Sequence, residues 1–548
     1  MSFFQLVRRE MQGSLGRLAF VSALGGVSTT SILGAINTGA QAADKGQISL
    51  WATVFFIIAL LLFIQTQHYI LITTTAEIGA IIHKLRVRLM NYVRRAELLP
   101  LETIGRAEIV SAITMETTTL TQASNTLAFA VQGALLIILV MGYVAYLSFF
   151  AFVLCIVIVG VGAALFHSKT RQHAVEMREA STWENQLYDR LSDVLDGFKE
   201  VRLNRARSDA LFDHLVEVSR AAANIKIRTQ SETYRRMVLL QSSLYILLGA
   251  VAFVVPMFSD TMGAGSITKA VTALVFIVGA CAGLVQSIPI IAAANTAADR
   301  LEQLEIKLGQ IASRSDEIAP LPAKNFSKIE MRDVEFHYTD KSSEAVFRVG
   351  PFNFTLNSGD LVILTGGNGS GKSTFMKLLA GFYRPASGEI LLDGSPVGND
   401  SSYENYRSLI TAIFPDFHLF QRLYGIPDPN PEELIRLLTQ FRLQDKTYLA
   451  HGEFRTVDLS SGQRRRLALI VAQLEKRPLL LLDEWAADQD PEFRRKFYFE
   501  LLPALHRAGV TVVAISHDDR YIDEMDVVMR RLRMDEGRFT ELSSVETG

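Results

Sequence analysis

Residues 366–374 read Gly366-Gly367-Asn368-Gly369-Ser370-Gly371-Lys372-Ser373-Thr374, and this stretch decides the fold of the C-terminal half of the chain. An apolar run at 361–365 precedes it and reads as a buried strand, and a helical run at 375–379 follows it. The pattern G-x-x-x-x-G-K-[ST] between a strand and a helix predicts a loop whose backbone N–H groups surround phosphates. We expect Lys372 to reach the β- and γ-phosphates and the Ser373 hydroxyl to ligate Mg²⁺.

A second apolar run supports the same chemistry. Four leucines at 479–482 end in Asp483 and Glu484, and a continuous apolar run is typical of a buried parallel strand. Carboxylates at the carboxyl end of such a strand face the crevice where α/β sheets bind ligands. We expect Asp483 to hold Mg²⁺ through water and Glu484 to orient and polarise an attacking water. His517 follows another strand-like run, 510–516, and is expected to contact the γ-phosphate.

The composition indicates two unlike parts. The 548 residues include 55 Lys+Arg against 57 Asp+Glu, and a net charge of −2 argues against nucleic acid as a partner. Hydrophobic residues are 49% and the mean hydropathy is +0.21, which suggests one part in lipid and one in water. The two cysteines, Cys155 and Cys281, lie in apolar runs, so a disulfide framework is not expected.

Six apolar runs before residue 300 are long enough to cross a bilayer, which takes about 20 residues. They are 16–37, 50–73, 126–146, 151–166, 237–258 and 267–294. The third and fourth form one block broken only at 147–150, so we expect two crossings joined by a tight turn. Six such runs would need an enormous core in a soluble protein, and we therefore predict a membrane domain.

The links between these runs alternate in character. Those after the second and fourth runs are long and rich in Lys and Arg, which places them and both termini in the cytoplasm. Both links read as helical hairpins, 74–125 with a break at 100–105 and 167–236 with a break at 204–208.

The N-terminus resembles a signal peptide. Arg8 and Arg9 precede an apolar run, which is followed by Ala40-Gln41-Ala42. The length of the run favours an uncleaved span.

One more motif lies between the two phosphate-site elements. Leu459-Ser460-Ser461-Gly462-Gln463 opens a helix, and a serine pair with a glycine at such a start makes an anion site. In this order, the motifs resemble the nucleotide-binding domain of ABC transporters, and the six runs with two long cytoplasmic links resemble the exporter-type transmembrane domain. The resemblance implies an all-α membrane domain of six helices with long cytoplasmic hairpins, fused to an α/β P-loop ATPase domain. We place the first domain at 1–311, a linker at 312–328 and the second domain at 329–548.

The resemblance also implies roles for individual residues. Tyr338 matches the aromatic residue that stacks on adenine, and Asp490 matches the end of the loop after the catalytic glutamate. In this family Ser461 and its neighbours bind the γ-phosphate held by the P-loop of the other subunit, so a chain with one set of motifs is a half-transporter, most simply of a homodimer. ATP and Mg²⁺ are the implied cofactors, Glu484 and His517 the catalytic residues, and Ser373 and Asp483 the metal ligands. The implied nucleotide-binding residues are Tyr338, Gly366, Gly367, Asn368, Gly369, Ser370, Gly371, Lys372, Ser373, Thr374, Ser460, Ser461, Gly462, Gln463 and Asp490.

One position departs from the family. Its usual Q-loop glutamine should fall near residue 415, but the segment 412–420 contains none and the next is Gln421. We expect Asp416 or a water molecule to take its place at the metal.

Three stretches resemble a narrower group, the bacterial exporters of cyclic peptides and siderophores of the pyoverdine and syringomycin type. They are 197–205 (GFKEVRLNR), 414–420 (FPDFHLF) and 483–490 (DEWAADQD). This resemblance implies ATP-driven export of a peptide-like, cyclic-peptide or siderophore compound across the bacterial inner membrane, with membrane lipid around the spans. A lipid or multidrug flippase, an importer of metal-loaded siderophore with the exporter fold, and an ATP-gated regulatory protein remain open, because they share the motifs.

Two further interpretations concern coupling and cargo. The hairpin tips at 197–209 and 101–106 are expected to contact the ATPase domain; a basic, solvated helix end is the alternative at 197–209. Polar side chains inside the spans are candidates for cargo binding, with helix–helix hydrogen bonding as the alternative. They are Gln65, Gln67, His68, Gln132, Gln241 and Gln286.

Overall fold

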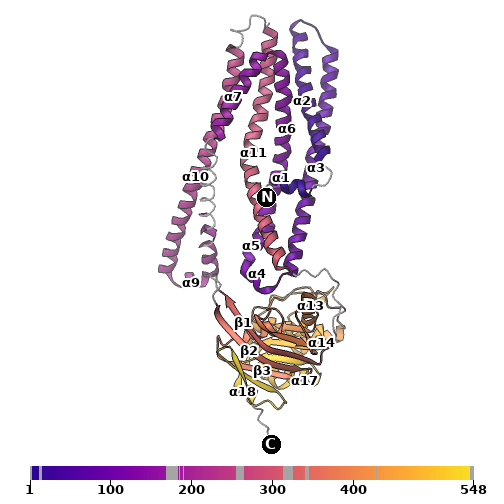
Figure 1. The fold of residues 1–548 in the computed structure, drawn as a ribbon, viewed down its shortest axis with the longest axis vertical. Helices are drawn as coiled ribbons and strands as arrows, with labels where there is room; N and C mark the ends of the chain where they lie inside the picture. The colour runs from indigo at the N-terminus through magenta and orange to yellow at the C-terminus, as the bar shows by residue number, and fades with distance from the viewer. Residues whose placement is uncertain are drawn as a thin grey trace. The chain divides into compact units, whose positions relative to one another are not determined.

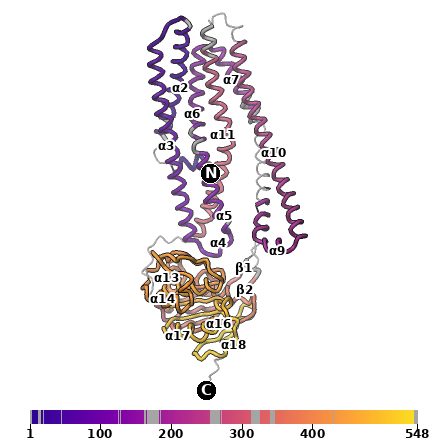
Figure 2. Tube along the Cα trace, turned by 180° about the vertical axis from the view of Figure 1, so that it is seen from behind, coloured from indigo at the N-terminus to yellow at the C-terminus, as the bar shows by residue number. Residues whose placement is uncertain are grey.

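The first part of the chain is helical throughout its described residues. The computed structural model describes residues 3–10, 15–167, 183, 186–188, 190–254, 264–312, 325–339, 345–427 and 429–542. It divides into two units, Met1–Asn91 with Arg106–Lys307, and Tyr92–Gly105 with Leu308–Gly548. Helices of the first unit run side by side in Figures 1 and 2, among them α2, α3, α6 and α11. Its helices are α1 (Phe3–Glu10), α2 (Leu15–Asp44), α3 (Leu50–Arg95), α5 (Arg106–Ser111), α6 (Thr117–Leu147), α7 (Phe149–His167), α9 (Phe198–Leu203), α10 (Arg205–Gly249) and α11 (Ala264–Ile311), with π-helical turns at Ala112–Glu116 and Ala250–Val254.

Five helical stretches among the described residues are long and apolar enough to cross a membrane. They are Gly16–Ala43, Leu50–Arg95, Phe129–Leu147, Arg205–Val254 and Val271–Ile311, and Phe149–Val161 is a shorter apolar helix. The fourth expected span, 151–166, falls in α7, which follows α6 after the single residue Ser148. The end of the fifth expected span, 255–258, and most of the expected linker, 313–324, lie outside the described residues.

Three of these helices are much longer than a bilayer requires. The 46 residues of α3, the 45 of α10 and the 48 of α11 correspond to about 70 Å each at a rise of 1.5 Å per residue, whereas a hydrocarbon core is about 30 Å thick. The polar end of each therefore extends out of the apolar region, as the amphipathic links predicted. An apolar core that includes Leu33, Val140, Cys155, Leu247 and Leu274 joins α2, α6, α7, α10 and α11.

The helix breaks in the long links differ from expectation in one place. The first link breaks at Gly105, within the expected 100–105, and also at Ala96 and Glu97, while Pro100 lies inside α4 (Leu98–Ile104). A proline in the first turn of a helix is tolerated because its missing N–H has no intrahelical acceptor there. The second break falls at Asn204, whose side chain accepts a hydrogen bond from the backbone N–H of Arg207 at 3.1 Å and caps α10.

The second unit is built on a six-stranded sheet of order β12-β11-β3-β10-β9-β6, parallel except for β12. Its strands are β3 (Leu361–Gly366), β6 (Ile410–Ile413), β9 (Leu479–Asp483), β10 (Thr511–Ile515), β11 (Arg530–Asp535) and β12 (Arg538–Leu542). An antiparallel sheet of order β2-β1-β4-β5 comprises β1 (Lys328–Thr339), β2 (Ala345–Asn357), β4 (Ser387–Leu392) and β5 (Ser395–Pro396), and β7 (Leu449–Ala450) pairs with β8 (Glu453–Phe454). The helices are α4, α12 (Lys372–Leu379), α13 (Asp400–Ser408), α14 (Pro431–Gln440), α15 (Ser461–Glu475), α16 (Pro491–Lys496), α17 (Leu502–Arg507) and α18 (Asp519–Asp523), with further turns at Trp485–Asp488 and Phe497–Leu501.

Both faces of the parallel sheet are buried. Along β9, Leu480 and Leu482 face one hydrophobic core, while Leu479 and Leu481 face another. The same alternation holds in β3 and β10. This burial explains why the strand sequences are continuous apolar runs rather than alternating ones.

Candidate functional site

Three adjacent parallel strands bring the sequence motifs to one edge of the sheet. β10 lies between β3 and β9, and Ile515 pairs with Leu364 on one side and with Asp483 on the other. The loop after β3, the acidic pair at the end of β9 and His517 after β10 therefore emerge together at the carboxyl edge. This is the position where open α/β sheets bind ligands.

The loop after β3 needs glycine for steric reasons. Gly366 has φ +145°, and a Cβ there would lie 2.2 Å from the carbonyl oxygen of Met534. Gly371 has φ +103°, and its Cβ would lie 2.7 Å from Cγ1 of Val349. Among the other expected residues of this loop, Gly367, Asn368 and Gly369 are exposed, while Ser370 is buried. The loop therefore presents backbone to solvent in the manner expected of a phosphate cradle.

Lys372 lies within this loop. Its side chain is buried, and Nζ donates hydrogen bonds to the carbonyl oxygens of Gly366 at 3.0 Å and Gly367 at 2.8 Å. Burial lowers the pKa of Lys372, while the nearby carboxylates of Glu484 and Asp483 act in the opposite direction. The ammonium group is thus close to Asp483 at the end of β9 and to Glu484, which follows the strand.

Asp483 is a buried carboxylate without a hydrogen-bond partner. Its side chain is 2% exposed, and neither of its oxygens has a hydrogen-bonding partner in the described part of the chain. Burial raises its pKa, whereas the Ser373 hydroxyl and Lys372 act to lower it. A carboxylate and a hydroxyl in such a position are oxygen ligands of the kind that Mg²⁺ prefers, so these residues fit the expected metal.

Glu484 and His517 are in direct contact. Nε2 of His517 lies 3.0 Å from Oε1 of Glu484, and both side chains are partly exposed. Glu484 adopts a left-handed conformation with φ 50°, and its backbone N–H donates to the carbonyl oxygen of Ile515 at 3.2 Å. The arrangement presents a carboxylate and an imidazole to whatever occupies the edge of the sheet.

The motif 460–463 forms the start of α15. Ser460 and Gln463 form a reciprocal capping box, with Ser460 N–H donating to Oε1 of Gln463 at 3.2 Å. Ser461 is exposed, and a Cβ at Gly462 would lie 2.7 Å from the carbonyl oxygen of Asp488. Within the described residues, no hydrogen bond joins these four residues to 366–374.

The loop after Glu484 is tied to α15 by residues that the sequence did not single out. Nη1 of Arg465 donates to the carbonyl oxygen of Glu484, and its Nε lies 3.0 Å from Oδ2 of Asp488. The Trp485 indole N–H donates to the carbonyl oxygen of Arg465 at 2.9 Å, so the indole is fixed from the same helix. The catalytic candidate and the start of α15 thus form one braced element.

Asp490 takes part in the same brace. Its carboxylate caps α16 by accepting the Phe493 N–H at 2.8 Å, and it pairs with Nη2 of Arg466 at 2.5 Å. Arg466 also donates to Gln489 at 2.8 Å and lies 3.8 Å above the ring of Phe493. In this chain Asp490 is therefore a cap and an ion-pair partner.

Tyr338 lies near the end of β1, close to the helix that follows the phosphate loop. Its hydroxyl is 3.3 Å from Oγ1 of Thr374. Its ring packs edge-on against Phe336 at 5.1 Å and Tyr383 at 6.1 Å between centroids. The ring is thus held next to α12, and its stacking on adenine stays a prediction.

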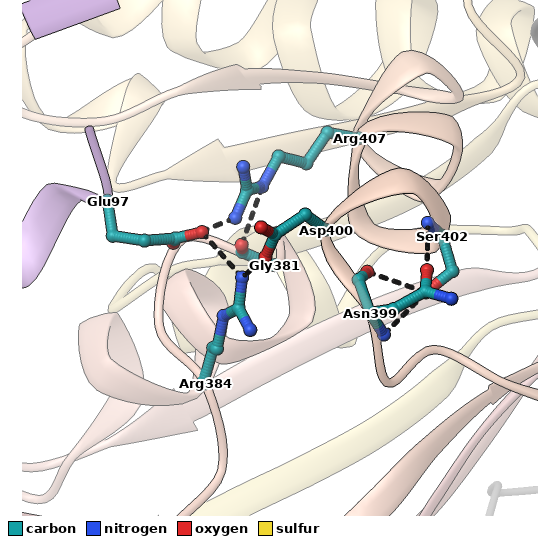
Figure 3. Close-up of polar contacts among 7 residues, drawn as sticks. All are labelled: Glu97, Gly381, Arg384, Asn399, Asp400, Ser402 and Arg407. Carbon is teal, nitrogen blue, oxygen red and sulfur yellow. Dashed lines mark hydrogen bonds and ion pairs between the residues drawn. The ribbon is translucent and has the colours of Figure 1, made fainter. Parts of the chain in front are cut away.

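The part of the first cytoplasmic link at Tyr92–Gly105 belongs to the same unit as the ATPase domain and contacts it (Figure 3). Glu97, in the break between α3 and α4, accepts hydrogen bonds from Arg384 at 2.9 Å and from Arg407 at 3.0 Å. Arg384 also pairs with Asp400 at the start of α13. Both guanidinium groups lie over the ring of Tyr403, at 4.9 and 5.5 Å. This two-arginine clamp on Glu97 ties the link to α13.

Two further hydrogen bonds lie near Glu97 and help to position Arg407 and the start of α13 (Figure 3). Nε of Arg407 donates to the carbonyl oxygen of Gly381 at 2.8 Å. Asn399 caps α13 through a reciprocal pair with Ser402, whose N–H donates to Oδ1 of Asn399 at 2.8 Å. Arg407 is therefore positioned by a capped helix and a fixed carbonyl.

A second polar contact lies one helical turn further on. Tyr383 donates its hydroxyl proton to Glu102 at 3.0 Å and accepts a hydrogen bond from Lys377 of α12 at 3.0 Å. Burial raises the pKa of Tyr383, so the hydroxyl stays neutral and remains a donor. The expected contact at 101–106 is thus made by 97–102. The other expected tip, 197–209, forms α9 and the start of α10 in the first unit, and its contact with the ATPase domain stays a prediction.

The segment without the expected glutamine follows β6. Asp416 is exposed there, and its role at a metal stays a prediction. Aromatic side chains hold the segment: Phe414 packs against Phe382 at 5.7 Å, and Arg464 of α15 lies 5.7 Å from the ring of Phe417. The loop therefore contacts the start of α15 through a cation and an aromatic ring.

Comparison with known proteins agrees with this geometry. Residues 349–487 match the family model described as ABC transporter. The ATP-binding protein SyrD of Pseudomonas syringae pv. syringae is 34% identical over 456 residues, covering 79% of this chain and 78% of that protein. The chain belongs to the ABC transporter family.

Other members are similar over parts or over the whole fold. An ATP-dependent lipid A-core flippase of Aromatoleum aromaticum is 34% identical over 40% of this chain and 37% of its own length. The putrescine transport ATP-binding protein PotG of Escherichia coli is 31% identical over 41% of this chain and 61% of its own length. The structure of a bacterial Atm1-family ABC exporter with ATP bound has a TM-score of 0.76 at 18% identity and covers 97% of this chain and 95% of that one, so the fold is that of an exporter.

This ABC protein is an ATPase coupled to transport, with its apolar helices in the inner membrane and its ATPase domain in the cytoplasm. The expected fold class is confirmed: a helical membrane domain is joined to a P-loop ATPase domain of ABC type. The domain binds ATP. Half-transporters of this kind generally act as dimers.

Proposed function

We propose that the chain is one half of a homodimeric exporter that uses ATP hydrolysis to move a peptide-like compound, such as a cyclic peptide or a siderophore, out of the cytoplasm. The observation that carries the hydrolytic part is the 3.0 Å contact between Glu484 and His517 at the carboxyl ends of β9 and β10. A chain that only sensed ATP would not need this carboxylate and imidazole together. Their presence argues against the ATP-gated regulatory alternative.

The chemistry assigns a role to each residue at the sheet edge. Glu484 orients and polarises the attacking water, and His517 holds Glu484 and contacts the γ-phosphate. Lys372 exchanges its bonds with the loop carbonyls for bonds to the β- and γ-phosphates. Ser373 and Asp483 hold Mg²⁺, with Asp416 or water in place of the missing glutamine. When bound, the metal neutralises charge on the phosphate oxygens.

The remaining roles depend on a second copy of the chain. Tyr338 stacks on adenine, while Ser460, Ser461, Gly462 and Gln463 complete the site on the partner subunit by binding the γ-phosphate. The resemblance to half-transporters supports this role, because each chain carries one loop 366–374 and one motif 460–463. Two composite sites then form between two chains, and Asp490 positions the motif through Arg466.

Hydrolysis reaches the membrane through the first cytoplasmic link. The clamp of Arg384 and Arg407 on Glu97 and the contact of Tyr383 with Glu102 connect α3 to the ATPase domain. Closure of two ATPase domains around ATP moves the residues that contact this link. The long helix α3 then transmits the movement to the spans. The tip at 197–209 makes a corresponding contact.

The cargo class rests on two supports. SyrD is similar over most of the chain, and the stretches 197–205, 414–420 and 483–490 resemble the exporters of cyclic peptides and siderophores. A lipid flippase is the second candidate, because a lipid A-core flippase is similar over 40% of the chain. Multidrug export and import of a metal-loaded siderophore share the same fold.

ATPase stimulation tests the cargo class. The purified protein in lipid nanodiscs is mixed with a neutral cyclic peptide, a metal-free peptide siderophore, the same siderophore with iron, a lipid A-type lipid and a hydrophobic dye. We expect the first two compounds to stimulate ATP hydrolysis severalfold in the wild type and not in Glu484→Gln. Stimulation by the lipid, the dye or the iron complex alone would contradict peptide-like export.

A further inference from the structure

A cavity of about 430 Å³ lies in the helical unit between α2, α3, α6 and α11. Its lining includes three glutamines from three different helices: Gln67 of α3, Gln132 of α6 and Gln286 of α11. All three were among the six polar candidates identified in the spans. The volume is in the range of small-molecule sites.

The amide groups of these glutamines have spare hydrogen-bonding capacity. Oε1 of Gln67 is shielded from solvent and has no partner, and Gln132 is only 9% exposed. Within the described part of the chain, none of the three side chains makes a hydrogen bond to the protein. Neighbouring hydroxyls differ, because Ser287 donates to the carbonyl oxygen of Leu284 at 2.6 Å in its own helix. An unpaired amide shielded from solvent is costly, so hydrogen bonding between helices does not explain Gln67 and Gln132; Gln286, which also lines the cavity, is exposed.

The three glutamines also lie at a common depth. Each is six to eight residues from the cytoplasmic end of its expected span, at 73, 126 and 294. That distance corresponds to roughly 9–12 Å along a helix. The cavity is therefore in the cytoplasmic half of the membrane, where a compound arriving from the cytoplasm would first be held.

Small residues contribute to the volume of this cavity, and its described lining contains no charged side chain. Gly279 and Gly283 line the cavity, and a Cβ added at either would meet no atom within 4 Å. No Asp, Glu, Lys, Arg or His belongs to the described lining. A charged ligand would find no counter-ion here, whereas an uncharged polar ligand would find donors and acceptors.

We propose that this cavity binds uncharged amide groups of the exported compound through Gln67, Gln132 and Gln286. The inference rests on the proposed function and names the part of the cargo that is recognised. A glutamine amide offers two donors and an acceptor, which complement the carbonyl and N–H of a peptide bond. The substrate class is thus a peptide with a neutral stretch whose amides are unpaired.

Two kinds of variant test the proposal. One kind keeps the approximate volume of the side chain and removes its amide, and the other fills the cavity. Gln67→Leu, Gln132→Leu and Gln286→Leu remove the amide and are compatible with an apolar environment. Gln65→Leu is the matched control, because Gln65 is exposed on α3 and does not line the cavity. Gly283→Leu fills the cavity from a position with free space, and leucine is also favourable in a helix.

Equilibrium binding of a radiolabelled neutral hexapeptide, cyclic with alternating leucine and glycine, is measured on the full-length protein in nanodiscs. We expect each glutamine variant to weaken binding about 3–10-fold, the effect of one lost hydrogen bond, and Gly283→Leu to abolish it. Gln65→Leu should bind as the wild type does, with basal ATP hydrolysis also unchanged. The fully N-methylated peptide, which lacks amide donors, should bind the wild type more weakly.

Two results would overturn the inference. Equal affinity of the wild type, the glutamine variants and Gly283→Leu for the peptide would exclude the cavity while leaving peptide export intact. Absence of binding to the wild type would contradict both the cavity and peptide export. If a glutamine variant fails to fold, Gly283→Leu and the N-methylated peptide still decide the question.

Discussion

Glu484 holds its position through its backbone as well as its side chain. Its N–H bonds to β10, its carbonyl accepts from Arg465 of α15, and its carboxylate contacts His517. The residue adopts a left-handed φ of 50° at the end of the strand. One residue thus links the sheet edge, the following loop and the helix that begins with the serine motif.

Replacing Glu484 with Gln is expected to lower the rate of ATP hydrolysis about 10²–10⁴-fold, because the amide cannot accept the proton of the attacking water. ATP binding should persist, since the loop 366–374 is unchanged. Phosphate release and nucleotide binding are measured on the purified dimer.

Glu492→Gln is the matched control, because that carboxylate is exposed on α16 and pairs with Arg442. Its hydrolysis rate should equal that of the wild type. Retention of more than a tenth of the rate in Glu484→Gln would exclude Glu484 as the general base.

At the scale of elements, two sets of contacts carry the mechanism. One braces the start of α15 against the loop 484–490 through Arg465 and Arg466. The other attaches α4 to the ATPase domain through Glu97 and Glu102. Each joins segments that are distant in the sequence.

Arg466→Ala should destabilise the ATPase domain by about 1–3 kcal/mol, because it leaves the buried Gln489 oxygen without its donor and removes the contact with Phe493. Chemical unfolding of the full chain in detergent, followed by the fluorescence of Trp485, measures this loss. Arg442→Ala, which breaks an exposed pair, should leave the transition unchanged. An unaltered transition in Arg466→Ala would show that the brace does not stabilise the domain.

The same brace depends on pH in a defined direction. The Phe493 N–H and the Arg466 guanidinium hold the pKa of Asp490 below its usual range. Its contribution to stability is therefore present above the ordinary pKa of an aspartate, about 4, and is lost as the pH falls through the lower folded value. The difference in stability between the wild type and Asp490→Asn should shrink when unfolding is followed from pH 6 downward. A difference that grows below pH 4 would contradict this assignment.

Glu97→Ala should reduce transport while leaving most ATP hydrolysis, because it releases both arginines from the first link. The ratio of cargo moved to ATP hydrolysed, measured in proteoliposomes, should fall severalfold. Glu108→Ala is the control, since Glu108 pairs with Lys307 within the first unit. Equal ratios in Glu97→Ala and the wild type would show that this clamp does not couple the two processes.

The sequence predicted those parts of the site that depend on local pattern. The loop 366–374, the acidic end of β9 and His517 each follow an apolar strand, and parallel strands bring their carboxyl ends together. The clamp on Glu97 could not be predicted in the same way, because Arg384 and Arg407 lie about 290 and 310 residues away in the chain. Pattern also could not separate Gln67 from Gln65, since helix rotation in the packed bundle decides which side chain faces the cavity.

At the scale of the whole molecule, one chain supplies one phosphate loop and one serine motif. Under the proposed function, hydrolysis requires two chains, and each composite site combines parts of both. The long helix α3 runs from its span into the first cytoplasmic link, and the amide-lined cavity lies among the spans. Cargo binding, closure of the proposed dimer and hydrolysis are then linked in one cycle.

Mixing wild-type chains with chains carrying Ser461→Arg tests the composite site. An arginine at the start of α15 should block the site on the partner subunit while leaving its own loop free. If activity requires both sites, ATP hydrolysis should fall with the square of the wild-type fraction in randomly assembled dimers. A linear decline would contradict the requirement for both sites and would indicate that each site hydrolyses ATP independently.

Direction-resolved transport tests the central claim most directly. Inside-out membrane vesicles expose the ATPase domain, and accumulation of a neutral cyclic peptide or a metal-free peptide siderophore is measured with and without ATP. We predict ATP-dependent accumulation against a concentration gradient in the wild type and none in Glu484→Gln. Equal accumulation in the two proteins, or ATP-dependent loss of compound loaded into the vesicles, would contradict the account.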